Sequence, residues 1–150
     1  MIIGIPKEIK NHENRVSMIP FAVEELVKSG HTLLVENNAG SGSGFSNENY
    51  IAAGANLIPT AAEVFQSADM IVKVKEPQPI ELEMIKKDQI VFTYFHFAAD
   101  ETLTKTFINT EAIAIAYETV QSDNGSLPLL IPMSEVAGRM AVLEGAKCLE

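Results

Sequence analysis

The chain has 150 residues, 47% of them hydrophobic and 21% charged, which predicts one soluble globular domain and excludes a disordered tail. Its formal charge of −9, with 20 acidic residues against 11 basic ones, excludes nucleic acid as the expected partner, because phosphate binding needs clustered lysine and arginine. Because the chain as a whole is acidic, a basic ligand-binding site on it is expected to be confined to a small part of the surface.

Strand and helix patterns alternate at close spacing along the first half of the chain. The strands are expected at residues 2–6 and 32–36, and the helices at 20–29, 47–55 and 60–68. Gly30 stands where the first helix should stop. A short apolar run at 56–58 separates the second and third helices.

The second half continues this alternation. Strands are expected at residues 70–74, 90–95 and 112–117, and helices at 80–87 and 101–109. The uninterrupted apolar runs at 90–92 and 112–116 are typical of strands covered on both faces, as in parallel sheets. The order predicts an α/β fold, a three-layer sandwich with a mostly parallel sheet.

The last twenty residues form a different pattern. Ser134 is expected to cap a helix over residues 135–150, with Glu135 favourably placed in its first turn. That helix has apolar residues at helical spacing and no stop signal, which predicts a truncated fragment. We therefore expect residues 1–131 to form one domain and residues 132–150 to begin the connection to another.

Cysteine content and the apolar runs indicate the compartment. Cys148 is the single cysteine and cannot form an internal disulfide, and the opening MIIGIP is too short for the core of a signal peptide. No apolar run approaches the roughly 20 residues needed to cross a bilayer. The sequence predicts a cytoplasmic protein without a membrane anchor.

Cationic or titratable side chains stand at three expected strand ends. Arg15 follows the first strand, Lys75 closes the strand that begins at residue 70, and His96 closes the strand that begins at residue 90. Because the carboxyl ends of strands in an open α/β sheet meet in one crevice, we expect these groups to lie together. A guanidinium, an ammonium and an imidazole in one cleft suit a small anionic oxo-acid.

Each of these residues also has a purely structural interpretation. An exposed loop arginine is common in a polar stretch such as that around Arg15, although the planar fork of arginine suits a bidentate carboxylate clamp. Lys73 and Lys75 alternate with valines, which is also typical of an edge strand that resists aggregation. His96 shares a strand face with Tyr94, so a hydrogen-bonded core histidine is the alternative to a general acid or base.

Two other patterns do not predict a bound group. The segment GSGSG at residues 40–44 lacks the G-x-G-x-x-G spacing of a dinucleotide site, so a flexible turn is expected in preference to a phosphate cradle. The three histidines and the one cysteine show no metal-ligand spacing, so no metal is expected.

Five segments in order carry a resemblance to a known family. They are IIGIPKEIKNHENRV at 2–16, GSGSGF at 40–45, VKVKEP at 72–77, FTYFHFAA at 92–99 and PMSEVAGRM at 132–140. Together they closely resemble alanine dehydrogenase over essentially the whole chain. The soluble nucleotide-binding subunit of transhydrogenase and the saccharopine dehydrogenases share the opening block. The transhydrogenase subunit lacks an equivalent of His96, and the saccharopine dehydrogenases match the intervening segments less well.

The resemblance implies the substrate domain of a two-domain dehydrogenase, Rossmann-like or flavodoxin-like in architecture. It implies reversible, NAD-dependent oxidative deamination of L-alanine to pyruvate and ammonium by the full-length enzyme, with this fragment inactive alone. Arg15 and Lys75 match substrate-binding groups, and His96 and Lys75 match catalytic ones. Ser134 matches a contact to the NAD phosphates, while the main NAD domain is expected beyond residue 150. Family members are commonly homohexamers.

Two other functions remain open at this point. A stand-alone module that binds a keto acid for regulation would use the same cleft without chemistry, and a transhydrogenase-related domain would bind nucleotide. A strand, a glycine-rich loop and an acidic residue downstream of residue 150 favour the enzyme, whereas an immediate stop favours the module.

Overall fold

One parallel sheet organises residues 1–149, which the computed structural model describes. Its six strands follow the order β3-β2-β1-β4-β5-β6, and every neighbouring pair is parallel. The strands are β1 (Ile2–Ile5), β2 (Thr32–Glu36), β3 (Asn56–Ile58), β4 (Met70–Val72), β5 (Ile90–Thr93) and β6 (Ile113–Ala116). This is the doubly wound order of the Rossmann type, so the α/β prediction is confirmed, and of its two variants the Rossmann-like one is observed.

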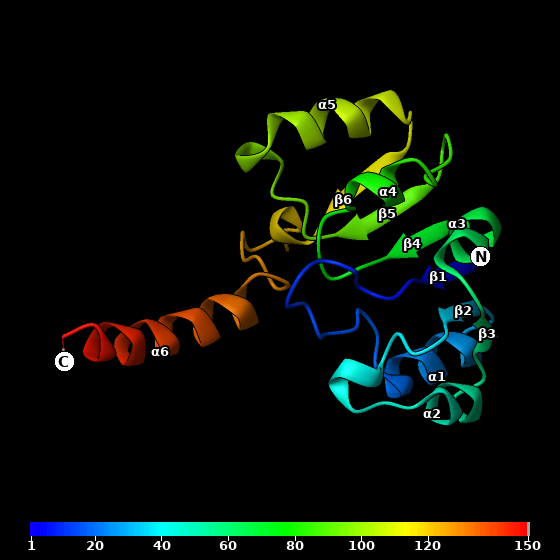
Figure 1. Cartoon of the computed structure of the whole chain (residues 1–150), viewed down its shortest axis with the longest axis horizontal. Coiled ribbons are helices and arrows are strands. Elements are labelled where there is room, and N and C mark those ends of the chain that lie inside the picture. The colour runs from blue at the N-terminus through cyan, green and yellow to red at the C-terminus, as the bar shows by residue number, and fades with distance from the viewer. Residues whose placement is uncertain (150) are drawn as a thin grey trace.

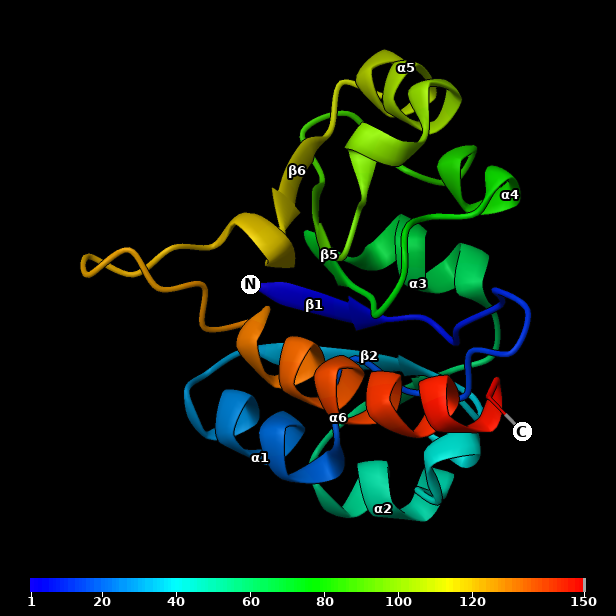
Figure 2. The same ribbon diagram turned by 90° about the vertical axis from the view of Figure 1, so that its left-hand side faces the viewer.

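Helices cover both faces of the sheet (Figures 1 and 2). They are α1 (Pro20–Lys28), α2 (Asn47–Ala52), α3 (Ala61–Ser67), α4 (Pro79–Leu82), α5 (Glu101–Asn109) and α6 (Ile131–Lys147), with 3-10 turns η1 (Ser41–Ser43), η2 (Phe97–Ala99) and η3 (Tyr117–Thr119). One core cluster packs α1 and α2 on one face, and a second packs α3, α4 and α5 on the other. By contrast, α6 extends away from the sheet, and none of its side chains is buried.

Gly4→Ala is expected to destabilise the domain, because Gly4 of β1 lies directly beneath α3. A Cβ at this position would meet Val64 Cγ1 at 2.7 Å and Ala68 Cβ at 2.9 Å, so strand and helix would have to move apart. Overpacking of this kind costs about 1–3 kcal/mol, and we expect chemical denaturation to show a loss of that size. The control is Gly138→Ala in α6, where an added Cβ meets open space and alanine favours the helix. An equal loss in both variants would contradict this explanation.

Two helices are shorter than the sequence predicts. Beyond α2, Gly54 has a φ of 89°, the left-handed conformation that ends helices. Beyond α4, the amide of Lys86 donates to the side chain of Gln89 at 3.2 Å and does not continue the helix. A left-handed glycine thus follows the end of α2, and a side-chain contact outside the helix holds the residue before the predicted end of α4.

The prediction that residues 112–116 form a strand covered on both faces is wrong. β6 lies at the edge of the sheet beside β5, and Ile113 and Ile115 are 49% and 37% exposed. In the described part of the chain, α6 runs outward and does not fold back over this strand. The apolar run thus indicates a strand but not its position in the sheet.

The start of α6 also differs from expectation. Leu130 occupies the N-cap position, and Pro132 lies in the first turn. Proline suits that place because its fixed φ is helical and no amide hydrogen is needed there. Ser134 therefore lies inside the helix, and its amide donates to the carbonyl of Leu130 at 3.0 Å, so its predicted capping role is wrong. The predicted last residue, Glu150, lies outside the described residues.

Candidate functional site

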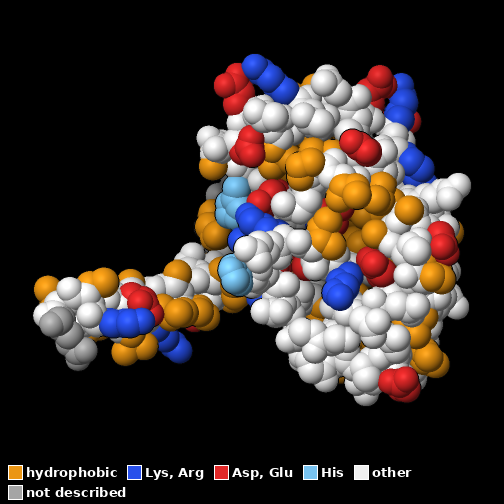
Figure 3. Space-filling view, viewed as in Figure 1, with side chains coloured by type: hydrophobic (Ala, Val, Ile, Leu, Met, Phe, Trp, Pro, Cys, Tyr) orange, Lys and Arg blue, Asp and Glu red, His pale blue; other side chains and the backbone are white. Residues whose placement is uncertain are grey.

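The candidate site lies along the carboxyl edge of the sheet. β1 and β4 are adjacent at its centre, and the chain continues from them toward opposite halves of the sheet, so the crevice beyond their ends is the topological switch point. Arg15 follows β1, Lys75 follows β4, and His96 follows the neighbouring β5. Figure 3 shows histidine and basic side chains gathered on the side of the body from which α6 extends.

Arg15 already holds a carboxylate of this chain. Its Nε donates to Glu13 Oε1 at 2.8 Å and its Nη2 to Glu13 Oε2 at 2.5 Å, a bidentate geometry. Its Nη1 points to Met133 Sδ at 3.3 Å, in the first turn of α6. The guanidinium is therefore oriented from both sides although its side chain is 47% exposed. A ligand carboxylate must displace Glu13 or share the fork with it.

Glu13 should make folding sensitive to acid. The side-chain hydrogen bond from Arg15 lowers the pKa of Glu13 from 4.5 to about 2, and the charges of Arg15 and Lys75 add to this effect. Because the folded pKa is depressed, ionised Glu13 stabilises the fold above about pH 4.5, and this contribution is lost as the pH falls toward about 2. We therefore expect Glu13→Gln to flatten the pH dependence of the free energy of unfolding in this window.

Chemical denaturation at a series of pH values checks this expectation. Glu83→Gln, which alters an exposed carboxylate beside α4, is the control and should reproduce the wild-type curve. If the Glu13→Gln curve ran parallel to the wild-type curve, Glu13 would not be the acid-sensitive group.

Lys73 is fully buried between two carboxylates. Its Nζ lies 2.7 Å from Glu81 Oε1 and 3.2 Å from Glu8 Oε2, and all three side chains are at most 3% exposed. Burial raises the pKa of Glu81, and the Lys73 ammonium opposes that rise. Because β4 lies between β1 and β5 in the middle of the sheet, the alternative of an edge strand carrying Lys73 and Lys75 is wrong.

Backbone contacts determine where Lys75 stands. β4 ends at Val72, two residues earlier than predicted. The amide of Lys73 still donates to the carbonyl of Phe92 in β5 at 3.0 Å, and the next two amides turn to a side chain. Val74 N donates to Glu8 Oε1 at 2.6 Å, and Lys75 N approaches the same oxygen at 3.4 Å. On the other side, the carbonyl of Lys75 accepts from Thr93 Oγ1 at 2.8 Å. Both the amide and the carbonyl of Lys75 are therefore held by hydrogen bonds. Lys75 itself is partly exposed.

A second carboxylate holds the loop that carries His96. Glu118 Oε1 accepts from the amide of His96 at 2.7 Å and from that of Phe95 at 3.2 Å. His96 has a φ of 54°, in the left-handed region that non-glycine residues rarely adopt and that recurs at functional sites. Its exposed ring stacks on Tyr94, with centroids 6.1 Å apart and planes at 12°. The imidazole lies beside the phenol, as predicted, but beyond the end of β5.

A pocket of about 420 Å³ borders Arg15. Tyr94 and Tyr117 line it together, with ring centroids 4.8 Å apart at 90°, and burial raises the pKa of both phenols. Met133 brings the first turn of α6 to the same pocket. The pocket therefore combines one guanidinium with a largely apolar wall, which suits a small organic anion.

The structure connects the three predicted residues through their neighbours. Lys75 and His96 do not line the pocket beside Arg15. The charge of Lys75 contributes to the lowered pKa of Glu13, the partner of Arg15. His96 stacks on Tyr94, which lines the pocket with Arg15. Arg15, Lys75 and His96 thus follow strands along the same edge of the sheet, which we call the rim, but they do not share one pocket.

The glycine-rich segment packs against the loop that carries Arg15. A Cβ on Gly42 would meet Asn14 O at 2.6 Å, and Ser43 Oγ donates to that same oxygen at 3.0 Å. Glycine is needed here for close approach of two backbones. The segment contains a packed 3-10 turn, and Gly42 within it supports the loop that carries Arg15.

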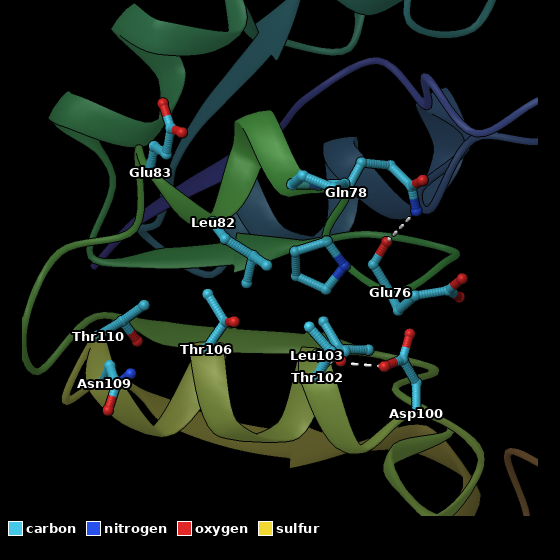
Figure 4. Close-up of a pocket in the computed structure, with 12 residues that line it drawn as sticks. Glu76, Gln78, Leu82, Glu83, Asp100, Thr102, Leu103, Thr106, Asn109 and Thr110 are labelled. Atoms are coloured by element: carbon cyan, nitrogen blue, oxygen red, sulfur yellow. Dashed lines mark hydrogen bonds between the residues drawn. The ribbon is translucent and has the colours of Figure 1, made fainter.

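Another pocket, of about 540 Å³, lies between α4 and α5 (Figure 4). Leu82 and Thr106 face each other across it, and Glu83 and Asp100 also line it. No lysine, arginine or histidine contributes to this lining. Its charge does not suit a small anion, so the smaller pocket beside Arg15 is the better candidate.

Residues 1–149 contain neither a cluster of potential metal ligands nor a helix that could span a membrane. Within that range no three His, Cys, Asp or Glu side chains come together as a metal ion would require. None of the helices described there has both the length and the apolar character needed to cross a bilayer. The groups that the rim can present to a ligand are the guanidinium of Arg15, the ammonium of Lys75 and the imidazole of His96.

Three carboxylates at the site were not singled out by the sequence analysis. Glu8 and Glu13 lie in the charged loop after β1, and the density of charge there is the available signal for them. Glu118 lies 22 residues from His96 and has no local signal, because its partners are two backbone amides.

A six-stranded, doubly wound parallel sheet with helices on both faces defines an α/β domain of the Rossmann type. The family described as "Alanine dehydrogenase/PNT, N-terminal domain" matches residues 4–137. The chain belongs to this family, as its sequence motifs predict.

Individual relatives agree with this assignment. The alanine dehydrogenases of Methanococcus maripaludis and Staphylococcus saprophyticus are 53% and 52% identical to the chain over 150 residues, all of this chain and 40% of each relative. A solved L-alanine dehydrogenase structure superimposes with a TM-score of 0.91 at 50% identity, covering 98% of this chain and 40% of that one. The crystal structure of the transhydrogenase from Sinorhizobium meliloti gives 0.74 at 29% identity, covering 79% and 35%. The chain thus spans about 40% of the length of its curated relatives.

Proposed function

We propose that this chain is the substrate-binding domain of an NAD-dependent alanine dehydrogenase. The full-length protein reversibly converts L-alanine, NAD and water to pyruvate, ammonium, NADH and a proton. Residues 1–131 form the substrate domain, and residues 132–150 begin the helix toward a nucleotide-binding domain. The observation that carries the proposal is the placement of Arg15, Lys75 and His96 after three adjacent strands, in a chain 53% identical to an alanine dehydrogenase.

Each of the three residues has a separate task on pyruvate. The Arg15 guanidinium binds the carboxylate in the bidentate manner that its contact with Glu13 already illustrates. The Lys75 ammonium donates a hydrogen bond to the ketone oxygen, and the His96 imidazole exchanges a proton with that oxygen. Donors positioned in advance stabilise the negative charge that develops there.

Among the described residues 1–149, the loop after β1 does not form a dinucleotide cradle. The loop between β1 and α1 is polar and lacks G-x-G-x-x-G, and α1 begins at Pro20 without a glycine turn. At α6, the amide of Ser134 is occupied by Leu130, which leaves the exposed hydroxyl of Ser134 as its proposed contact to the NAD phosphates. We assign the main NAD site to the part of the full-length protein outside this chain, where nicotinamide supplies or accepts the hydride.

Turnover by the full-length protein tests the proposal. We expect NADH to form from NAD with L-alanine, and to be consumed with pyruvate and ammonium, while residues 1–150 alone show no turnover. Glycine and serine serve as competing substrates. We also propose that the full-length protein is cytoplasmic and forms a homohexamer. Light scattering on the same preparation measures the mass of the assembly and so tests the hexamer. Absence of alanine-dependent NADH formation by the folded full-length protein would refute the proposal.

Two other outcomes identify the competing functions. Pyruvate binding without any NADH oxidation would indicate a regulatory keto-acid module. Hydride exchange between two nicotinamide nucleotides, without an amino acid, would indicate a transhydrogenase-related domain, whose fold this chain shares at a TM-score of 0.74. The higher identity to alanine dehydrogenases, 53% against 29%, favours the amino-acid reaction.

A further inference from the structure

Glu8 links the two loops that meet at the topological switch point. It lies in the loop after β1, between that strand and Arg15, yet its carboxylate accepts from Val74 N at 2.6 Å and approaches Lys75 N at 3.4 Å. The side chain of Glu8 is 3% exposed, so these contacts are shielded from water. A buried acceptor of backbone amides holds those amides more firmly than an exposed one does.

The sheet itself does not make this connection. β1 and β4 pair only at Ile3 with Met70 and at Gly4 with Ile71. Beyond these pairs the two chains separate into loops, and the Glu8 carboxylate continues the contact. A second link, between Lys10 Nζ and Glu76 Oε1, joins the same loops but is more exposed.

Lys73 aims the Glu8 carboxylate. Lys73 Nζ lies 3.2 Å from Glu8 Oε2, which leaves Oε1 to the two backbone amides. Glu81 binds the other side of the same ammonium at 2.7 Å, and its second oxygen accepts from Gln78 N at 2.7 Å. Glu8 and Glu81 are therefore equivalent partners of one buried lysine, but only Glu8 touches the backbone of Lys75.

We propose that Glu8 is a positioning residue, which sets the place of Lys75 relative to Arg15 across the switch point. The inference rests on the proposed function, because it assigns Lys75 and Arg15 to the same substrate. This proposal gives Glu8 no contact with the substrate. Its effect on catalysis comes through the backbone of residues 74 and 75.

The test compares Glu8→Ala with Glu81→Ala in the full-length protein. Both variants remove one ion pair from Lys73 and should lose stability to a similar degree. We expect the KM for pyruvate to rise about tenfold in Glu8→Ala alone, since a buried charged acceptor of the Lys75 loop is lost, while the KM for NADH is unchanged. Glu8→Gln keeps a side-chain carbonyl and should show a smaller rise. This milder variant also carries the test if Glu8→Ala does not fold.

Hydrogen exchange measured by mass spectrometry adds a readout that does not depend on activity. Exchange at the amides of Val74 and Lys75 should rise about tenfold in the Glu8 variant, and exchange at the amide of Gln78 should rise in the Glu81 variant. Pro77 has no exchangeable amide hydrogen and lies between the two regions. Equal pyruvate KM values in the two variants, or unchanged exchange at residues 74 and 75, would overturn the inference. If the wild type lacked turnover, the proposed function would fail, and the exchange data alone would still decide whether Glu8 holds this loop.

Discussion

Replacement of His96 by asparagine is expected to lower kcat for pyruvate amination by about 10²- to 10⁴-fold, because the proposed proton exchange at the ketone oxygen is lost. Asparagine tolerates the left-handed backbone of His96, with its φ of 54°, so this change removes the imidazole without adding strain. The loop should stay in place, since Glu118 holds the amide of residue 96 and not its ring. Steady-state kinetics on the full-length protein measure the effect.

His12→Asn is the matched control for this change. His12 is also an exposed histidine with a left-handed backbone, at a φ of 63°, but it follows β1 and has no proposed role. We expect its turnover to remain near that of the wild type. Comparable kcat values for His96→Asn and His12→Asn would remove His96 from the reaction.

Arg15→Lys is expected to lower kcat/KM for pyruvate by about 10²-fold, chiefly through a higher KM. Lysine keeps the positive charge but cannot present two parallel N–H groups to a carboxylate. It also cannot hold Glu13 in two places while pointing a third nitrogen at Met133, as Arg15 does. The decrease in kcat/KM therefore measures the contribution of the planar guanidinium geometry and not that of the positive charge.

Arg139→Lys supplies the control, because Arg139 is the other arginine of the chain and lies exposed on α6. Kinetics with pyruvate as the varied substrate should show no change for this variant. Retention of the wild-type pyruvate KM in Arg15→Lys would mean that Arg15 serves Glu13 alone.

The pairing of Arg15 with Glu13 has a consequence for binding. A substrate carboxylate approaches a guanidinium that already carries one carboxylate, so part of its interaction replaces an existing contact. The charge of Lys75 also contributes to the lowered pKa of Glu13. Glu13 thus neutralises the Arg15 guanidinium before substrate arrives.

Local sequence patterns determined the elements of this protein and the loops that carry the candidate site. Apolar runs and stop residues such as Gly30 give the strands and helices of the sheet region to within a few residues, because these signals depend on neighbours along the chain. Placing Arg15, Lys75 and His96 at strand ends needed no tertiary structure. In a parallel sheet, every strand presents its carboxyl end to the same edge, whatever the strand order.

Tertiary structure alone decided the strand order, the partners of the charged groups and the start of α6. Glu8 and Val74 are 66 residues apart, and nothing in either segment specifies the other. Lys73 reads as an exposed strand lysine until β1 and β5 enclose β4 and two carboxylates surround its ammonium. Periodicity reports which residues share a face. Which side chains from distant loops then meet depends on how the whole chain packs. A buried charge is costly unless it is paired, and its partner can come from any segment that the fold brings close.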